Sequence, residues 1–222
     1  MCYNKTISLL TFFVMAISTI YLIYRNYPND RWFSIIFISA GIMQLVEYFM
    51  WQNQSCGITN HLATISTFLI LLIQPIATII GAYFFGNLVF NRKKLLPIIW
   101  IYGIIIGIIA IIGINYGIKN RLCTLPNGRH LDWNISKLFG GETGVYIFFF
   151  LYYAIFLLIL LSRPWYLGFI IAIMLLGTLF FSVFFIKNPS WKSIWCWIVN
   201  FIPIIYIIIS YFILKNVKKL SI

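Results

Sequence analysis

The sequence predicts an all-α fold, a polytopic integral membrane helix bundle with about seven transmembrane helices in a single domain spanning residues 1–222. Of the 222 residues, 62% are hydrophobic and only 9% are charged, whereas soluble domains average roughly 45–50% apolar and 25% charged residues. The apolar residues also gather in runs of about 20, the length that a helix needs to cross a bilayer core about 30 Å thick. The lipid bilayer is therefore the first partner that the sequence predicts.

Seven apolar segments are long enough to cross a bilayer. They are residues 6–24, 32–51, 62–84, 96–117, 144–162, 165–186 and 193–214. The first segment lacks a small-residue cleavage pattern at its far end, so we expect an uncleaved signal anchor. The longest connection, an extramembrane loop at 118–143, contains turn signals at 126–128 and 140–141. Its length of about 26 residues favours a self-structured or functional loop that could cap the bundle.

The basic residues indicate contact with lipid headgroups rather than with nucleic acid. A net charge of +12 in a soluble protein would suggest nucleic-acid binding. Here the Lys and Arg side chains lie in short clusters between apolar runs, as orientation signals do. Nine of them fall on the side that holds loops 25–31, 85–95 and 163–164 and the C-terminus, and seven fall on the other side. The more basic side is predicted to be cytoplasmic.

Sequons and cysteines favour the same orientation. Three N-x-[ST] sequons begin at Asn4, Asn53 and Asn134, and all lie on the less basic side, where Asn53 and Asn134 are candidate glycosylation sites. All four cysteines lie on that side too, and disulfides persist in oxidising compartments. We therefore expect an N-terminus that is outside or luminal and a cytoplasmic C-terminus, in a host or viral membrane. The alternative is that the sequons arise by chance in an Asn-rich chain.

Polar residues interrupt the apolar runs most densely at 43–75, and these residues form the candidate ligand-binding site. Glu47 is the only acidic residue inside a long apolar run, and such a group costs about 2.5–3.5 kcal/mol at membrane depth on insertion scales. Helical periodicity places Gln44 and Trp51 on the face of Glu47 and aligns Thr67 with Gln74 on the next helix. Asn200 contributes a third polar face in the last segment. The candidate set is Gln44, Glu47, Trp51, Thr67, Gln74 and Asn200.

Two functional interpretations of this set remain open. In the first, the residues line a polar cavity that opens to the outer side, binds a small solute, an ion or a lipid headgroup, and uses Glu47 as a charge or proton carrier. In the second, the polar side chains only hold helices together, at about 0.6–2 kcal/mol each, and the chain is a structural or assembly protein with no ligand. A membrane enzyme ranks third because no catalytic motif occurs.

Cys56 and Cys123 are the candidate disulfide pair, joining the loop between the second and third segments to the long loop. His61 and His130 lie on the same side, so a metal site is an alternative, as are unpaired cysteines. The Cys and His spacing is too irregular for a zinc signature. We therefore expect neither a metal nor a cofactor.

Two seven-helix classes fail a chemical test. A retinal protein needs a mid-membrane lysine for its Schiff base, and the last segment has none between Lys192 and Lys215. A G-protein-coupled receptor would carry an acidic residue paired with arginine at the cytoplasmic end of the third segment, and this chain lacks one.

Four short motifs resemble an uncharacterised multi-pass family of giant DNA viruses and protists. They are QLVEYFMWQNQSC at 44–56, Asn60, the Gln74-Pro75 pair and WKSIWCW at 191–197. The resemblance covers mainly the second, third and seventh segments. It implies a seven-helix membrane fold and no catalytic residue.

Overall fold

The computed structural model describes residues 4–127, 130–185 and 191–220, and confirms the all-α prediction. The helices are α1 (Lys5–Arg25), α2 (Asp30–Gln52), α3 (Ile58–Phe85), α4 (Leu96–Lys119), α5 (Glu142–Phe156), α6 (Trp165–Phe185), α7 (Trp191–Val199) and α8 (Ile202–Leu220). Three short 3-10 helices, η1 (Arg92–Leu95), η2 (Ser136–Phe139) and η3 (Leu157–Leu161), lie between or beside them. Strands β1 (Leu125–Asn127) and β2 (His130–Asp132) pair antiparallel in the long loop.

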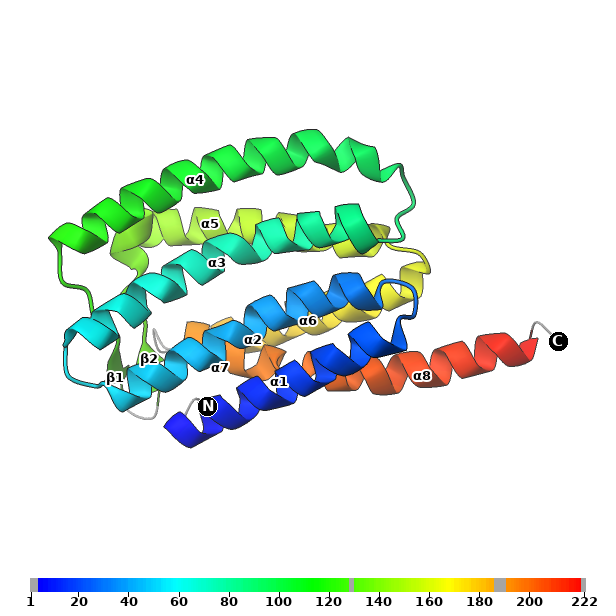
Figure 1. The fold of residues 1–222 in the computed structure, drawn as a ribbon, viewed down its shortest axis with the longest axis horizontal. Coiled ribbons are helices and arrows are strands. Elements are labelled where there is room, and N and C mark those ends of the chain that lie inside the picture. Colours follow the sequence, from blue (N-terminus) through cyan, green and yellow to red (C-terminus); the bar gives the residue numbers. More distant parts are fainter. Residues whose placement is uncertain (1–3, 128–129, 186–190, 221–222) are drawn as a thin grey trace.

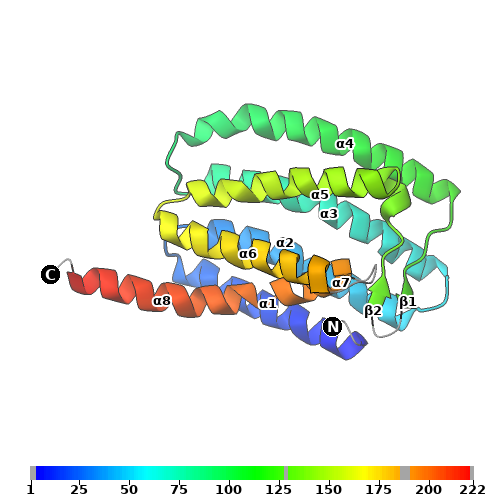
Figure 2. The same cartoon turned by 180° about the vertical axis from the view of Figure 1, so that it is seen from behind.

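The helices run along one common axis (Figure 1). Helices α1 to α6 alternate in direction, and α7 and α8 follow one another back toward the opposite end. The N-terminal end of α1, the α2–α3 loop and the β-hairpin lie together at one end of the bundle, which we call the hairpin end. The α1–α2, α3–α4 and α5–α6 connections lie at the opposite end, which we call the basic end, and α8 projects past it (Figure 2). The basic clusters at 25–31, 92–94 and 163 are therefore gathered at one end.

Five helical segments among the described residues are long and apolar enough to cross a membrane. They are Lys5–Arg25, Asp30–Gln52, Ile58–Phe85, Arg92–Lys119 and Trp165–Phe184. The other two expected segments are less regular. The segment expected at 144–162 becomes the 15-residue α5 followed by the tighter η3.

The last expected segment, 193–214, is not one continuous helix but divides between α7 and α8. The amides of Asn200 and Phe201 bond to the carbonyls of Trp197 and Ile198, three residues back, so the α-helical pattern is interrupted there. Pro203, in the first turn of α8, has no amide hydrogen, and proline suits this position because the first amides of a helix have no partner within it. The sequence analysis expected one continuous segment at 193–214 and did not predict the break.

Glycines allow close helix packing at two crossings. A Cβ atom at Gly41 on α2 would lie 2.5 Å from Met15 Cγ on α1, and one at Gly113 on α4 would meet the ring of Phe68 on α3. Small residues at such points let membrane helices approach closely. They bring α1 close to α2, and α4 close to α3.

Asn29 joins three connections at the basic end. It begins α2 in a left-handed conformation, with φ of 68°. Its side-chain Nδ2 donates to the carbonyl of Arg163 at 2.8 Å, and its Oδ1 accepts from the amide of Asn87 at 2.7 Å. The α1–α2, α3–α4 and α5–α6 connections are therefore held to one side chain.

Candidate functional site

The carboxyl group of Glu47 lies at the centre of a buried polar cluster near the hairpin end. Gln44 Nε2 donates to Glu47 Oε2 at 3.0 Å, and Trp133 Nε1 donates to Glu47 Oε1 at 3.1 Å. Gln44 Oε1 in turn accepts from the hydroxyl of Thr11 on α1, at 3.1 Å. Gln44 and Glu47 are fully buried and Trp133 is 2% exposed. The cluster thus connects α1, α2 and the long loop at 118–143.

The partner that the sequence analysis missed here is Trp133. It follows β2 in the long loop, and its indole ring enters the bundle instead of remaining at the surface. A tryptophan in an otherwise polar loop is an available signal, because its large apolar ring favours burial while its N–H needs an acceptor. Thr11 was missed because a threonine in an apolar run usually bonds its own helix, and Thr11 also bonds the Ile7 carbonyl.

Gln74 belongs to a second polar cluster, deeper in the bundle. Its Nε2 donates to the carbonyl of Ser39 on α2 at 3.0 Å, and its Oε1 accepts from the hydroxyl of Tyr152 on α5. The adjoining space among α2, α3, α5, α6 and α7 has a volume of only about 10 Å³. That is about the least that can hold one water molecule. Among the described residues, the space beside Gln74 is therefore too small for a solute larger than water.

The other two intramembrane candidates lie on α3 and at the break between α7 and α8. The hydroxyl of Thr67 donates to the carbonyl of Ala63, within α3, at 3.1 Å. Asn200 is fully buried at the break between α7 and α8. Its Oδ1 lies 3.7 Å from the point where a Cβ on Gly41 would be, so it packs against α2.

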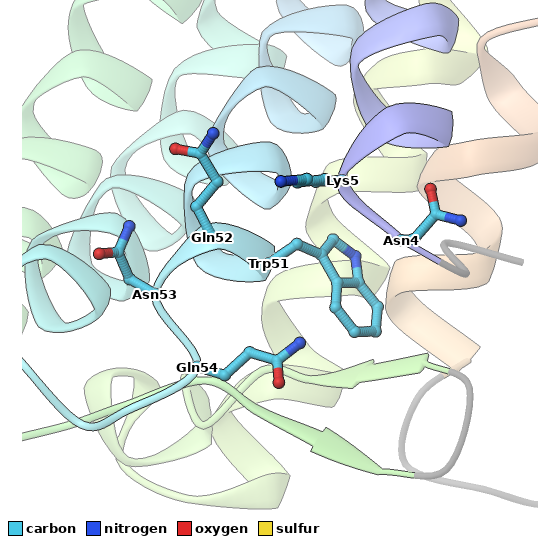
Figure 3. Close-up of a pocket in the computed structure, with 6 residues that line it drawn as sticks. All are labelled: Asn4, Lys5, Trp51, Gln52, Asn53 and Gln54. Carbon is cyan, nitrogen blue, oxygen red and sulfur yellow. The ribbon is translucent and has the colours of Figure 1, made fainter.

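An open pocket lies at the hairpin end, above the Glu47 cluster. Its volume is about 550 Å³, and Asn4, Lys5, Trp51, Gln52, Asn53 and Gln54 line it. Figure 3 shows the indole of Trp51 between the α1 residues Asn4 and Lys5 and the side chain of Gln54. Trp51 Nε1 is buried and has no hydrogen-bond partner among the described residues. We call this space the hairpin-end pocket.

The pocket and the buried carboxyl are connected through one helix face. Trp51 follows Glu47 by four residues on α2, so the two side chains lie on the same face, about 6 Å apart in helical rise. A ligand that moved the indole of Trp51 would therefore disturb the face of α2 that also contains Glu47, about one helical turn away.

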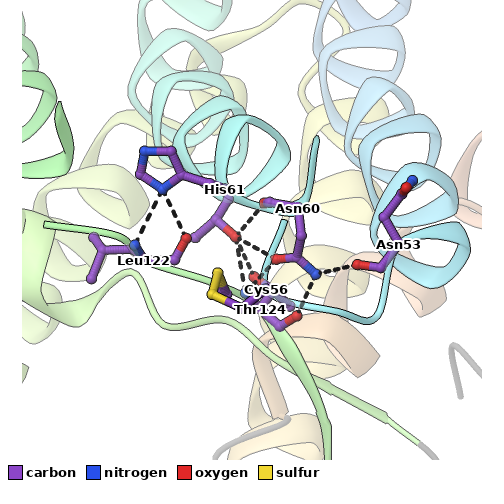
Figure 4. Close-up of a disulfide and its surroundings, with 8 residues drawn as sticks. Asn53, Cys56, Asn60, His61, Leu122 and Thr124 are labelled. Atoms are coloured by element: carbon purple, nitrogen blue, oxygen red, sulfur yellow. Dashed lines mark hydrogen bonds between the residues drawn. A yellow bond between two sulfur atoms is a disulfide. The ribbon is translucent and has the colours of Figure 1, made fainter. Parts of the chain in front are cut away.

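The structure joins Cys56 and Cys123 in a disulfide, with the two Cα atoms 5.5 Å apart (Figure 4). Hydrogen bonds beside it hold the same two segments. Asn60 Nδ2 donates to the carbonyls of Asn53 and Thr124, at 2.7 and 2.8 Å, and Asn60 Oδ1 accepts from the amide of Thr124 at 2.9 Å. The loop at 118–143 is thus fixed over the end of α3, as a cap.

The remaining candidates at the hairpin end have local roles. His61 Nδ1 lies 2.9 Å from the carbonyl oxygen of Leu122 and 3.2 Å from its amide nitrogen, so this ring nitrogen faces the loop backbone. Within the described part of the chain, no three His, Cys, Asp or Glu residues are grouped as a metal site would require. Asn53 ends α2 and Asn134 is exposed, both at the hairpin end. Cys2 and Lys187 lie outside the described residues.

A buried ion pair at the basic end was also missed. Arg25 Nε and Nη2 donate to the two carboxylate oxygens of Asp30, each at 2.8 Å, and the Tyr206 hydroxyl of α8 donates to Asp30 Oδ1 at 3.1 Å. Asp30 is fully buried. The sequence analysis placed both charged residues in a short loop, because nothing local indicates that α8 packs over them.

No family model, curated protein or solved structure matches this chain.

Proposed function

We propose that the chain is a seven-crossing membrane protein that binds a small polar solute at its hairpin end. The observation that carries this proposal is the buried indole N–H of Trp51, which has no acceptor among the described residues. It lies beside an open pocket of about 550 Å³ that Lys5 also lines. A buried donor without an acceptor costs about 1–3 kcal/mol. A solute with a carboxylate, phosphate or hydroxyl oxygen would supply that acceptor, and Lys5 would favour an anionic one.

Seven crossings are supported by the five long apolar helices together with two interrupted ones. The α5–η3 pair and the α7–α8 pair each connect opposite ends of the bundle (Figure 1). The proposed orientation places the hairpin end outside or in a lumen and the basic end in the cytosol. The disulfide at the hairpin end and the basic loops at the other end support it.

In the proposed mechanism, the solute binds first in the hairpin-end pocket and Glu47 responds to it. A solute that accepts from Trp51 Nε1 would fix the indole, which lies on the helix face of Glu47. The effect of the bound solute would then reach the Glu47 carboxyl group through the hydrogen bonds that Gln44 and Trp133 donate to it. Coupling between the solute and the bundle is therefore expected to depend on both Trp51 and Glu47.

The test is thermal unfolding and calorimetry of the full chain in lipid nanodiscs, with glycine, glucose, sodium phosphate and potassium chloride as probes. At least one acceptor-bearing probe should raise the unfolding temperature. Trp51→Phe, which keeps an aromatic side chain but removes the N–H, should abolish the increase. Trp100→Phe is the matched control, because Trp100 is 67% exposed on α4, far from the pocket. Loss of the effect in both variants would show a general response to tryptophan removal and would refute the pocket.

A second function, a structural or assembly protein without a ligand, is favoured by a different observation. The space beside Gln74 holds only about 10 Å³, and the buried amides of Gln44 and Gln74 bond to Thr11 of α1 and Ser39 of α2, respectively. Glu47→Gln separates the two functions. Lost stability with no stabilisation of the parent protein by any probe would support the structural function. A folded variant that no longer responds to the probe would support solute binding.

A further inference from the structure

A second pocket lies on the outside of the bundle, between α4 and α5. Its volume is about 470 Å³, and it is lined mainly by Ile109, Ile112, Tyr116, Phe139 and Phe148, with Lys137 at one end. Leu138, Gly140 and Gly144 complete its lining. We call this space the α4–α5 groove. It is separate from the hairpin-end pocket and from both polar clusters, with which it shares no lining residue.

The groove exists because α4 stands away from the rest of the bundle. Only 11% of its 18-residue apolar stretch is buried, compared with 50% of the corresponding stretch of α3. Its packing partners are α3, η1 and η2, and Figure 2 shows it arched over α5. Near the hairpin end, Gly113 holds it against Phe68 and the carbonyl of Leu138. An apolar surface remains open beside that contact.

The dimensions of the groove match part of one lipid leaflet. Ile109 and Tyr116 are seven residues apart on α4, which is a rise of about 10 Å. One leaflet of a bilayer core contributes about 15 Å of hydrocarbon. The groove ends at η2, the level at which the chain leaves α4 and enters the extramembrane loop. Its apolar walls therefore lie at acyl-chain depth and its end lies at headgroup depth.

The positive charge at the η2 end of the groove favours an anionic lipid headgroup. Among the described residues that line the groove, Lys137 carries the only charge, and its side chain is exposed. Lysines at such positions place their ammonium group at the membrane interface. Tyr116, at the same end of the lining, supplies a hydroxyl group, and tyrosines favour the interface for the same reason.

We propose that the α4–α5 groove binds one anionic phospholipid, with an acyl chain against Ile109, Ile112 and Phe148 and the phosphate of the headgroup at Lys137. The ion pair between phosphate and ammonium supplies the preference for an anionic lipid, and the apolar walls supply the seat for the chain. This site does not depend on the function proposed above, nor on which way the chain is oriented.

The experiment is native mass spectrometry of the delipidated full chain in detergent. Phosphatidylglycerol and phosphatidylcholine with identical acyl chains are added in separate titrations. We expect one retained phosphatidylglycerol per chain, at an affinity about fivefold above that of phosphatidylcholine, because one lysine near an anionic headgroup has an effect of that size. Equal affinity for the two lipids would overturn the headgroup assignment.

Two pairs of variants locate the lipid. Lys137→Gln should remove the fivefold preference, whereas Lys119→Gln, an exposed lysine in the last turn of α4 and outside the groove lining, should keep it. Ile112→Trp should fill the groove and weaken retention of both lipids. Ile111→Trp is its control, since Ile111 and Ile112 are each 62% exposed and only Ile112 lines the groove.

Other results would refute the groove. An equal loss of the preference for phosphatidylglycerol in Lys137→Gln and Lys119→Gln would show that the lipid binds to a diffuse basic surface. Unchanged retention in Ile112→Trp would place the chain of the lipid elsewhere. A doubled mass that disappears as lipid is added would show that a second copy of the chain covers this face. Circular dichroism and unfolding of each variant establish that it folds, and substitution of these exposed residues leaves the core intact.

Discussion

Trp133 of the loop at 118–143 donates its indole N–H to Glu47 of α2, across 86 residues of sequence, at 3.1 Å. The contact makes the loop part of the core, because Trp133 is 2% exposed and Glu47 is fully buried. The loop therefore covers the hairpin end of the bundle and also contributes a hydrogen-bond donor to the buried acidic group.

Replacing Trp133 by Phe should destabilise the protein by about 1–3 kcal/mol, since one oxygen of a buried carboxyl group loses a hydrogen bond while the aromatic volume largely remains. Reversible unfolding in mixed micelles measures the change. Trp100→Phe, at an exposed position on α4, should stay within about 0.5 kcal/mol of the parent protein. Equal values for the two variants would contradict a role for the Trp133 hydrogen bond.

Replacing Asp30 by Asn should destabilise the basic end by about 3–5 kcal/mol, because Arg25 would be left as a buried charge without its counter-ion. The neighbouring Arg31→Gln provides the control, since Arg31 is exposed. Unfolding of both variants in the same micelles gives the comparison. A small effect of Asp30→Asn would mean that water or lipid phosphate satisfies Arg25 instead.

Replacing Asn60 by Ala should destabilise the cap by about 1–3 kcal/mol, because the variant loses the hydrogen bonds to the carbonyl and the amide of Thr124. Hydrogen exchange of the Thr124 amide should also become faster. Asn120→Ala is the control, since Asn120 bonds only within its own turn, to the carbonyl of Tyr116, and is exposed. Unchanged exchange at Thr124 would show that the disulfide alone holds the loop.

Non-reducing peptide mapping, with thiols blocked during purification, should recover Cys56 and Cys123 in one linked pair of peptides. The bond closes a loop with a sequence separation of 67 residues, and the chain-entropy model assigns roughly 4 kcal/mol to such a closure. Because the membrane already restrains the unfolded chain, reduction should cost less than that. Recovery of the two cysteines as separately blocked thiols would contradict the bridge.

Tags at the two termini should differ in protease access in sealed vesicles. The proposed orientation leaves the N-terminal tag accessible from outside and the C-terminal tag protected. The opposite result would place the disulfide in the cytosol, where thiols are kept reduced, and would reverse the face from which the hairpin-end pocket is reached. Glycosylation at Asn53 or Asn134 would give independent support to the proposed orientation.

Much of the helical architecture follows from the sequence because membrane helices are long and apolar, and their lengths are set by the bilayer. The second expected segment, 32–51, corresponds to α2 at Asp30–Gln52, within two residues at each end. The break near Asn200 was not predicted, because a proline two residues into a new helix has the same local sequence as a proline that kinks a continuous one.

The candidate site could be predicted only within each helix. Helical periodicity relates Gln44, Glu47 and Trp51 because they share one face. It carries no information about Trp133, Tyr152 or Tyr206, which approach from segments that are distant in sequence. Thr67 was included for its place on a helix face, yet its hydroxyl bonds its own helix.

The bridge made by Asn29 has a mechanical consequence. Its side chain holds the turns before α2, before α4 and before α6 to one point at the basic end, while the disulfide and Asn60 hold the opposite end. Helices that are held together at both ends of a bundle do not separate at either end. Its helices can still bow in the middle, near Pro75 of α3, where the proline leaves the backbone short of one hydrogen bond. Any separation of the helices at the basic end would first have to break the hydrogen bonds of Asn29 to Arg163 and Asn87.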